Sequence, residues 1–456
     1  MRLGIGLGLF KSGLISAGVR IFSAFQTRVI NDGGTVEAGT CVVNAINSSA
    51  LLQQASLLLI PSGYKGGKLY AEIPTNGNGD LTWTRSGTAN RTNASGNIEL
   101  MGANVPRLSY MYGSCPSVLL EPQRTNLCLY SQQLDDANWS KAESSITANT
   151  TTSPDGTTNA DSLIENTANG LHQTTILTSA TGGVYTATIY AKPNGRNWFL
   201  FNIAAAANYG AFFDVQNGAV GTIQSNITSA TIISVGNGWY RCTVIANTAS
   251  ISPRISITLA TANNTISYTG NGTSGLYLYG GQIEAGAYPT TYIPTTSATA
   301  TRVADSFSRN NIYTNGLISA SGGTWFVEFR GNMAYTRDAF ADGLQLTNTA
   351  VTDRFTFTFG AGSPATSLVT IRKAVGGTLT SLYLTTTSTT KIAIKWNGTT
   401  ADIFANGTKV VSATSFTATQ LENLTGSGAD TPKFIQQMAL YPEPKSDQFC
   451  IDLTTI

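Results

Sequence analysis

Short runs of alternating apolar and polar residues, separated by corners rich in glycine and asparagine, constrain the fold of this chain more than any other feature. Residues 185–190, 198–203 and 239–244 are three such runs, and turn signals recur at intervals of roughly ten residues. Successive side chains of a strand point to opposite faces of its sheet, so this period predicts strands that bury one face. Many short strands joined by tight turns are typical of β-sandwiches. The pattern therefore predicts a mainly β protein.

The amino-acid composition agrees with this fold class and limits the kinds of partner that the chain can bind. Hydrophobic residues make up 41% of the 456 residues, enough for a core in each of the roughly two or three domains that this length favours. Charged residues make up only 11%, against roughly 25% in ordinary globular proteins. Such a surface suits a chain that neighbours in an assembly partly cover. The net charge is +2 without a dense basic run, so we expect no nucleic-acid partner.

The first two segments of the chain differ in pattern from the rest. Residues 1–62 carry apolar side chains at three- and four-residue spacing, for example Phe22, Phe25 and Val29, and predict two or three short helices. Their small polar surface favours an anchor or assembly segment, whose deletion is expected to leave a folded remainder. Residues 63–124 alternate short extended pieces with Asn-Gly turns and predict a connector of β-hairpins.

Two β-sandwich domains in tandem complete the predicted architecture, behind the short and partly helical N-terminal anchor. Residues 125–300 form the first sandwich, and a Thr/Ser-rich stretch near its end separates it from the second, at 301–456. In the second sandwich, Asn397-Gly398 and Asn406-Gly407 bracket an alternating run. These dipeptides predict hairpins with type I′ turns at both ends of the run.

The N-terminus opens on an apolar, glycine-rich strip at residues 3–10. The strip faintly resembles a secretion signal, but Lys11 and Arg20 interrupt it before any convincing cleavage site. No stretch of the sequence approaches the roughly 20 apolar residues of a membrane span. We therefore expect the strip to stay uncleaved and to pack against another protein, with no membrane partner. A signal or membrane-active role is the alternative.

The five cysteines are scattered and show no metal-binding spacing. We expect free, buried thiols in a protein assembled in a reducing cytoplasm. A bridge between Cys115 and Cys128 is the alternative, because connectivity does not follow from sequence. We expect no metal and no other cofactor, since isolated acids such as Asp155 and Asp402 are weak evidence for calcium.

Catalytic chemistry finds little support in the sequence. Asp135 and Asp136 are adjacent, so on a strand they would point to opposite faces, and we expect them in a turn before Trp139. His172 is the only histidine, and we expect it at the surface or at a cap. A Ser-His-Asp triad or a multi-histidine metal site would have to rest on it alone. The prediction is that the chain is not an enzyme and has no catalytic residues.

Three other acids lack the paired arrangement that glycoside hydrolysis needs. We expect Glu121 to form a structural ion pair with nearby Arg124, whereas Glu284 and Asp305 have no partner visible in the sequence. A polysaccharide depolymerase, which would need two placed carboxylates, is therefore the least favoured function.

Sugar binding is a more specific hypothesis than catalysis for this sequence. A sugar ring presents an apolar face ringed by hydroxyls, so its site needs an aromatic ring with polar groups beside it. Two groups near predicted strand ends meet this need: Trp198 with Asn197 and Arg196, and Tyr209 with Asn208. Core packing is the competing interpretation for Trp198. Four further tryptophans lie in strand-like or motif contexts and are expected in the core: Trp139, Trp239, Trp325 and Trp396.

Three stretches resemble bacteriophage virion proteins. The first is an arginine- and proline-containing motif of the connector: Gly63-Tyr64-Lys65-Gly66-Gly67-Lys68-Leu69-Tyr70, Arg85-Ser86, Arg91-Thr92-Asn93, Gly96-Asn97-Ile98-Glu99, Pro106-Arg107-Leu108 and Leu119-Leu120-Glu121-Pro122-Gln123-Arg124-Thr125-Asn126-Leu127. Residues 125–300 resemble the jelly-roll, carbohydrate-binding-module-like domain that often follows this motif. Its landmarks are Asn138-Trp139, Pro154-Asp155-Gly156, Gly236-Asn237-Gly238-Trp239-Tyr240-Arg241, Gly281-Gln282-Ile283-Glu284-Ala285-Gly286 and Tyr292-Ile293-Pro294-Thr295.

The last domain is similar to concanavalin A-like (laminin-G-type) modules. The similarity lies in the hairpin between Asn397-Gly398 and Asn406-Gly407, in residues 435–440 and in the tail at 452–454. Such modules are also jelly-roll sandwiches. The lectin-type hairpin is specific for the fold more than for a function.

Together the resemblances imply a virion fibre, spike or decoration protein, commonly a homotrimer, that displays lectin-like domains. They imply neither a head nor a tail position. Residues 1–62 would dock onto other virion proteins such as capsid, portal or tail, and a host-surface glycan would be the ligand. The expected location is the virion, assembled in the host cytoplasm. A secreted or cell-surface bacterial carbohydrate-binding protein is the alternative, which a processed signal peptide would favour.

Overall fold

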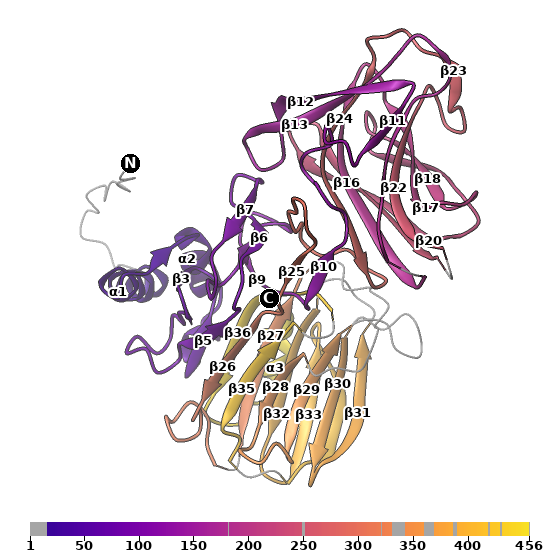
Figure 1. Ribbon diagram of the computed structural model, residues 1–456. Helices are drawn as coiled ribbons and strands as arrows, with labels where there is room; N and C mark the ends of the chain where they lie inside the picture. The colour runs from indigo at the N-terminus through magenta and orange to yellow at the C-terminus, as the bar shows by residue number, and fades with distance from the viewer. Residues whose placement is uncertain are drawn as a thin grey trace.

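The structure is a computed structural model that describes residues 16–455 apart from 181, 249–250, 321, 331–342, 360–368, 386–389, 418–419 and 429–430. The predicted apolar strip at residues 3–10 lies outside the described residues. Antiparallel strands dominate the described chain, which confirms the mainly β prediction. Figure 1 shows two β bodies, one above the other, with helices α1 (Ala17–Asn31) and α2 (Gly39–Ser48) to one side.

The upper body of Figure 1 contains two six-stranded antiparallel sheets. The first has the order β11 (Ser140–Ala142), β15 (Gln173–Leu177), β22 (Pro253–Ala260), β17 (Trp198–Ala204), β18 (Gly210–Asp214), β19 (Ala219–Ile223). The second has the order β12 (Ser144–Thr152), β13 (Thr158–Glu165), β24 (Gly275–Ala285), β16 (Val184–Asn194), β21 (Trp239–Asn247), β20 (Ile227–Gly236). A short pair, β14 (Asn169–Leu171) and β23 (Ser267–Thr269), lies outside these sheets. We call this body the middle sandwich.

Alternation along the strands builds the core between these two sheets. On β17, Phe199, Phe201 and Ile203 are completely buried in the core, whereas Trp198 and Asn202 are partly exposed. This is the period of two that the sequence predicts, because successive side chains leave a strand on opposite faces. On β17 the alternation therefore sets which side chains enter this core, although Leu200 on the other face is also buried, in a separate small cluster.

The lower body of Figure 1 is a second sandwich, built from both ends of the chain. Its ten-stranded sheet has the order β1 (Thr35–Val36), β3 (Gly63–Lys65), β4 (Lys68–Leu69), β5 (Leu81–Thr84), β26 (Ser306–Asn310), β35 (Asn423–Ser427), β28 (Leu344–Thr347), β29 (Arg354–Phe359), β30 (Val369–Val375), β31 (Thr378–Thr385). The facing sheet has the order β34 (Thr408–Ser415), β33 (Thr400–Ala405), β32 (Thr390–Trp396), β27 (Gly323–Phe329), β36 (Lys433–Tyr441), β9 (Ser117–Leu120), β8 (Leu108–Ser109), and β2 (Leu57–Leu59) also pairs with β36. We call this body the terminal sandwich.

The strand order places the middle sandwich between two parts of the chain that build the terminal one. β5 pairs with β26, while β2 and β9 pair with β36. A hairpin of β6 (Ala89–Thr92) and β7 (Ile98–Met101) and the pair β10 (Arg124–Asn126) and β25 (Ala300–Arg302) lie where the bodies meet. The sheets thus join segments that the sequence division at 62, 124 and 300 keeps apart, and that division stays a prediction.

The two predicted Asn-Gly corners of the terminal sandwich differ in conformation. Between β33 and β34, Asn406 and Gly407 have φ of 46° and 78°, as a type I′ turn requires. Between β32 and β33 only Gly398 has a positive φ, and the Asn397 side chain accepts the N–H of Thr400 at 2.9 Å. The prediction of a type I′ turn is therefore confirmed at the second corner and wrong at the first, where an asparagine side chain organises a longer loop.

The N-terminal segment contains the predicted short helices, α1, α2 and the 3₁₀ turn η1 (Leu52–Gln54). α1 begins after Ser16, whose hydroxyl accepts the N–H of Val19 at 3.3 Å, and Gly33 follows its end with φ 73°. The apolar run does not continue as helix to residue 60, because residues 57–59 form β2 instead. No helix in the described ranges is long and apolar enough to span a membrane.

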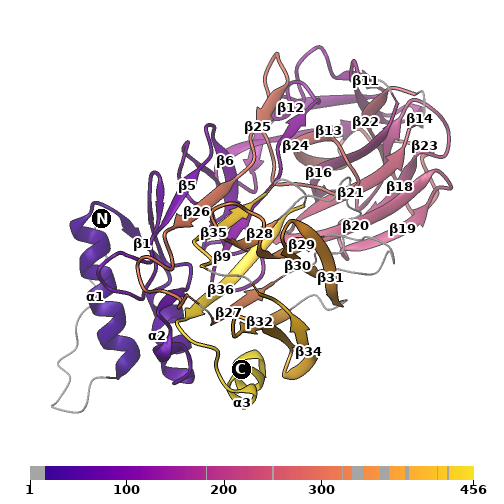
Figure 2. The same ribbon diagram turned by 90° about the horizontal axis from the view of Figure 1, so that it is seen from below.

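This segment covers the outer face of the terminal sandwich. Val42, Ile46 and Leu58 share a buried cluster with Phe326 and Tyr441 of β27 and β36. Figure 2 shows α3 (Asp447–Thr455) beside β32 and β34. Contact within the chain thus accounts for the apolar side chains of the described part of this segment, residues 16–62. Deletion of this segment would remove β1 and β2 and uncover that face, and the folding of the remainder stays a prediction.

A buried cluster of ion pairs lies where the chain passes between the sandwiches. Arg107 donates to Glu121 at 2.6 Å and also pairs with Asp305, whose other oxygen accepts from Arg85 at 2.9 Å. Arg302 reaches the Glu121 carboxylate at 3.0 Å. All five side chains are at most 2% exposed. We call Arg85, Arg107, Glu121, Arg302 and Asp305 the junction cluster.

The junction cluster corrects two expectations. Glu121 pairs with Arg107 and Arg302 and not with Arg124, because three-residue proximity along an extended chain does not bring two side chains together. Asp305 has two arginine partners from elsewhere in the sequence. Glu284 accepts hydrogen bonds from Gln282 and from Thr290, and Arg124 approaches it only to 4.0 Å.

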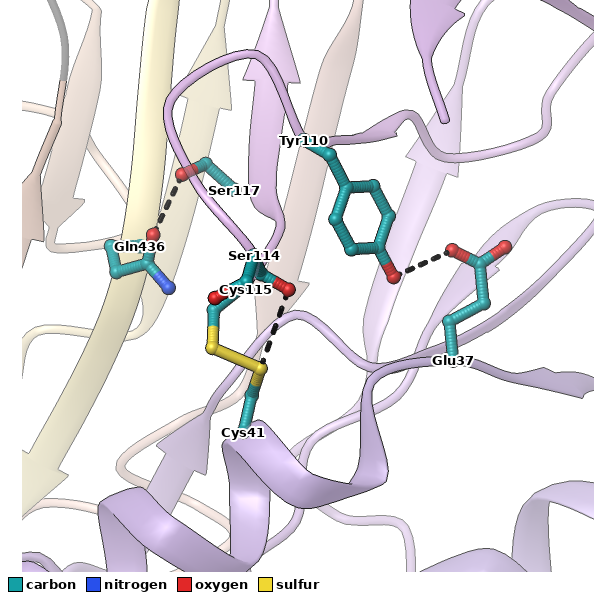
Figure 3. The surroundings of a disulfide bond; sticks show 7 residues. All are labelled: Glu37, Cys41, Tyr110, Ser114, Cys115, Ser117 and Gln436. Atoms are coloured by element: carbon teal, nitrogen blue, oxygen red, sulfur yellow. Dashed lines mark hydrogen bonds between the residues drawn. A yellow bond between two sulfur atoms is a disulfide. The ribbon is translucent and has the colours of Figure 1, made fainter. Parts of the chain in front are cut away.

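A disulfide joins Cys41 in the first turn of α2 to Cys115 in the loop between β8 and β9 (Figure 3). Cys128, Cys242 and Cys450 are free and buried. The prediction of five free thiols is therefore wrong for Cys41 and Cys115, and the alternative bridge to Cys128 is wrong as well. The partners are 74 residues apart in sequence, so only the tertiary fold brings them together.

We expect Arg107→Met to lower the free energy of unfolding by about 3–5 kcal/mol, because it leaves Glu121 and Asp305 buried with fewer partners. Urea unfolding followed by circular dichroism measures the change. The matched control is Arg20→Met, on the exposed face of α1, where a change below about 0.5 kcal/mol is expected. Equal stability of the Arg107→Met and Arg20→Met chains would contradict a structural role for the junction cluster.

Thiol titration of the unreduced, denatured chain should find three free thiols, and five after reduction. Substitution Cys128→Ser should lower the first number to two, since Cys242 and Cys450 would remain. A rise to four would instead show that Cys128 is a bridge partner whose loss frees Cys115. Ellman's reagent in guanidinium chloride measures both numbers.

Candidate functional site

The first predicted sugar-binding group, Arg196, Asn197 and Trp198, lies at the start of β17 on the outer face of the middle sandwich. Arg196 forms an ion pair with Glu165 at 2.6 Å and lies 5.0 Å from the ring centre of Tyr268. The Trp198 ring packs against the β19 backbone, since a Cβ added at Gly221 would lie 2.6 Å from it. Asn197 is exposed and Trp198 is partly buried.

The second predicted group, Tyr209 and Asn208, precedes β18 at the far end of the same hairpin. Trp198 pairs with Asp214, whereas Tyr209 accepts the N–H of Ile203 at 2.9 Å through its carbonyl. Five residues of strand separate the two ends, roughly 17 Å at the rise of a β-strand. The structure therefore does not bring the two groups into one site, and sugar binding by either group stays a prediction.

The other residues singled out from the sequence lie in the core or in turns. The four tryptophans expected in the core are at most 2% exposed, which confirms that expectation. Asp136 accepts the N–H of Asn138 at 2.8 Å in a turn before Trp139, as expected. His172 is completely buried, and its Nδ1 lies 2.6 Å from the carbonyl oxygen of Glu143. The expectation of a surface or cap position for His172 is wrong, because β14 and β23 cover it.

A cavity of about 300 Å³ lies where the two sandwiches meet, and sequence reasoning did not find it. The β8–β9 loop contributes Tyr110 and Tyr112, β16 contributes Tyr190, and β36 contributes Phe434. Ligand sites are mostly apolar hollows with a few placed polar groups, of roughly 300–1,000 Å³. We call this hollow the junction cavity.

The apolar wall of the junction cavity is held in place by covalent and polar contacts. The Tyr112 and Phe434 rings meet edge to face with centres 4.7 Å apart. The Tyr110 hydroxyl donates to Glu37 at 3.3 Å, and Ser117 donates to Gln436 at 2.9 Å (Figure 3). The disulfide at Cys115 ties the same loop to α2. These contacts position the aromatic residues before any ligand arrives, which lowers the entropy cost of binding.

Two apolar side chains at the cavity are open to solvent. Met111 is 38% exposed and Ile233 is 57% exposed, although both line the junction cavity. Single exposed apolar residues are common, but a pair beside an aromatic hollow is typical of binding sites. The cavity therefore has a partly apolar rim.

Arg241 supplies a buried charge to the cavity. It lies on β21 between Tyr190 of β16 and Ile233 of β20, on the sheet face that points away from the core. Its Nη2 donates to the Thr290 carbonyl at 2.6 Å, whereas its Nε has no hydrogen-bond partner among the described residues. The side chain is only 8% exposed.

Glu121 supplies a carboxylate to the same cavity but is committed to the junction cluster. It accepts the Thr291 N–H at 2.7 Å in addition to its arginine contacts. The charges of Arg302 and Arg107 outweigh burial and lower the pKa of Glu121 to about 2. A carboxyl with this pKa stays ionised at neutral pH, so it cannot donate a proton as a general acid. Burial raises the pKa of the neighbouring Tyr190 phenol, so that ring is neutral.

Sequence signals for the cavity existed without marking it as a site. Arg241 and Glu121 both belong to the landmarks of the phage-like resemblance, in the runs 236–241 and 119–127. Tyr110, Tyr112 and Phe434 belong to no such run. Their proximity depends on pairing between β9 and β36 across more than 300 residues of chain, which no local pattern encodes.

Comparison with known proteins gives weak similarities. No protein-family model and no curated protein sequence matches the chain. Among solved structures, the CBM40 of the Ruminococcus gnavus IT-sialidase bound to α2,3-sialyllactose is 17% identical and covers 31% of this chain and 86% of its own, at a TM-score of 0.23. The GH43 BlXynB protein of Bacillus licheniformis is 8% identical over 83% of this chain and 84% of its own, at a TM-score of 0.21. At such TM-scores these similarities carry no argument about function.

We expect acid to remove the stabilising contribution of Glu121. Its folded-state pKa of about 2 lies below the ordinary value of 4.5, so the contribution is present above pH 4.5 and is lost as the pH falls toward 2. Glu121→Gln should show a smaller loss of unfolding free energy across that interval, measured by urea titrations at a series of pH values. The control is Glu443→Gln, whose side chain is 68% exposed. Parallel curves for wild type and Glu121→Gln would contradict the shifted pKa.

Proposed function

We propose that this chain is a carbohydrate-binding protein without enzymatic activity, whose ligand site is the junction cavity. The observation that carries the proposal is the combination, in one hollow between two sandwiches, of aromatic rings with a buried guanidinium group. Aromatic faces suit the apolar faces of sugar rings, and fixed N–H donors suit their oxygen atoms. The cavity volume of about 300 Å³ lies at the lower end of the range for small-ligand sites.

The proposed setting is a bacteriophage particle. The resemblance to virion proteins in residues 63–127 supports it, and the residues of that motif include Arg85, Arg107 and Glu121 of the junction cluster. The disulfide is consistent with a protein that functions outside the reducing cytoplasm. Disulfides persist both on virion surfaces and in secreted proteins. In this proposal the protein is a homotrimeric fibre, spike or decoration component that presents the cavity to host-surface glycans.

A secreted or cell-surface bacterial lectin is the second candidate. The same disulfide favours it, because disulfides form readily in exported proteins. The phage-particle proposal and the lectin proposal use the same junction cavity. They differ in which other proteins the chain assembles with. Association with purified phage particles, detected by mass spectrometry of virions, separates them.

Substitution Tyr112→Ala should weaken glycan binding about tenfold, or by about 1.4 kcal/mol, because it removes an aromatic wall of the cavity. The probes are immobilised pectate, hyaluronate, dextran, mannan, lipopolysaccharides and capsular polysaccharides, with binding followed by biolayer interferometry. Trp198→Ala is the matched control, since it removes an aromatic residue from the outer face of the middle sandwich. Its binding should equal that of the wild type.

Three outcomes would contradict parts of the proposal. Loss of binding in Trp198→Ala with normal binding in Tyr112→Ala would place the site at the group predicted from the sequence. Absence of binding to every probe would contradict the carbohydrate-binding function. Shortening of any probe during incubation, detected by size-exclusion chromatography, would show a depolymerase. Circular dichroism of both variants confirms that each is folded.

A further inference from the structure

The junction cavity contains a positive charge that the chain itself does not neutralise. No carboxylate in the described part of the chain lies within ion-pair distance of Arg241, and its Nε lacks a hydrogen-bond partner there. A buried charge without a counter-charge is costly, and each unmade hydrogen bond of a charged group adds to that cost. A ligand that brings a negative charge would remove the first of these costs on binding.

The surroundings reinforce this positive charge. The junction cluster contains three guanidinium groups, on Arg85, Arg107 and Arg302, and two carboxylates, on Glu121 and Asp305. Among the residues that line the cavity, only Arg241 and Glu121 carry a charge, and Glu121 is already paired with Arg107 and Arg302. Both carboxylates are already bound by arginines, so they are poor partners for a cationic ligand. The electrostatic field in the cavity therefore favours an anion.

We propose that the glycan bound in the junction cavity carries a carboxylate, as an acidic sugar does, and that Arg241 binds this carboxylate. The inference rests on the proposed carbohydrate-binding function and specifies its ligand class. Nη2 of Arg241 already donates to Thr290 and Thr188, so the carboxylate would accept its charge-assisted hydrogen bonds from Nη1. Tyr112 and Phe434 then contact the apolar face of the same sugar ring. The carbonyl oxygen of Thr290, which also lines the cavity, accepts from Nη2 and holds the guanidinium in place.

The test compares each acidic probe with its carboxyl-reduced form, in which every carboxylate becomes a hydroxymethyl group. Pectate and hyaluronate are the carboxylated probes, dextran and mannan are the neutral ones, and glycerol teichoic acid carries phosphate without carboxylate. At least one carboxylated probe should bind, and carboxyl reduction should weaken its binding 10- to 100-fold, about the range for a hydrogen bond to a charged group.

Variants assign this effect to one residue. Arg241→Gln should lose the preference for the carboxylated probe over its reduced form, and Arg241→Lys should keep part of it because the charge remains. Arg254→Gln is the matched control: Arg254 is a half-buried arginine of the other sheet of the middle sandwich, its Nε is equally unpaired among the described residues, and it does not line the cavity. The control should keep the full preference.

Each result decides between the two proposals. Equal binding of native and reduced probes, or binding of teichoic acid that equals that of the carboxylated probes, overturns the carboxylate inference while carbohydrate binding stands. A preference that persists in Arg241→Gln overturns the role of Arg241. Absence of binding to all probes overturns the proposed function and this inference together. Thermal melting of the variants distinguishes lost recognition from lost folding.

Discussion

A cluster of charges without access to water holds the two sandwiches of this protein together. Arg107 bridges Glu121 and Asp305 at the place where the chain leaves the terminal sandwich and later returns to it. Charges buried in this way are tolerated only when each has partners, because desolvation costs several kcal/mol per ion. The cluster therefore ties the outgoing segment at Glu121 to the returning segment at Arg302 and Asp305, and fixes how the middle sandwich is inserted.

The same cluster forms part of the candidate site. Glu121 and Thr291 line the junction cavity and also belong to the hydrogen-bonded network behind it. The disulfide at Cys115 holds the aromatic loop on the opposite side. The cavity is thus framed by the contacts that join the two bodies. Although few residues of the chain are charged, several of the charged side chains lie together in the junction cluster. There they fix how the two sandwiches are joined, and they determine the electrostatic potential of the junction cavity.

The arginine- and proline-containing motif acquires a physical meaning from this arrangement. Arg85, Arg107 and Glu121 were recognisable in the sequence as landmarks, and the structure shows that they serve, with Asp305, as ion-pair partners. Arg91 of the same motif pairs with Glu37 and Glu99, which ties the β6–β7 hairpin to the N-terminal segment. The charged residues of the motif therefore join segments that are distant in the sequence, and this role does not depend on which ligand the cavity binds.

Local sequence patterns were enough to predict the mainly β fold, several of the strands and some of the turns, because these depend on neighbours a few residues away. Phe199, Phe201 and Ile203 alternate into the core as predicted, and Asn406-Gly407 makes its expected turn. Long-range packing was needed to establish the insertion of one sandwich into the other, the partner of Cys41, the partners of Glu121 and Asp305, and the meeting of Tyr112, Phe434 and Arg241. These contacts join residues tens to hundreds of positions apart, and local periodicity contains no information about such pairings.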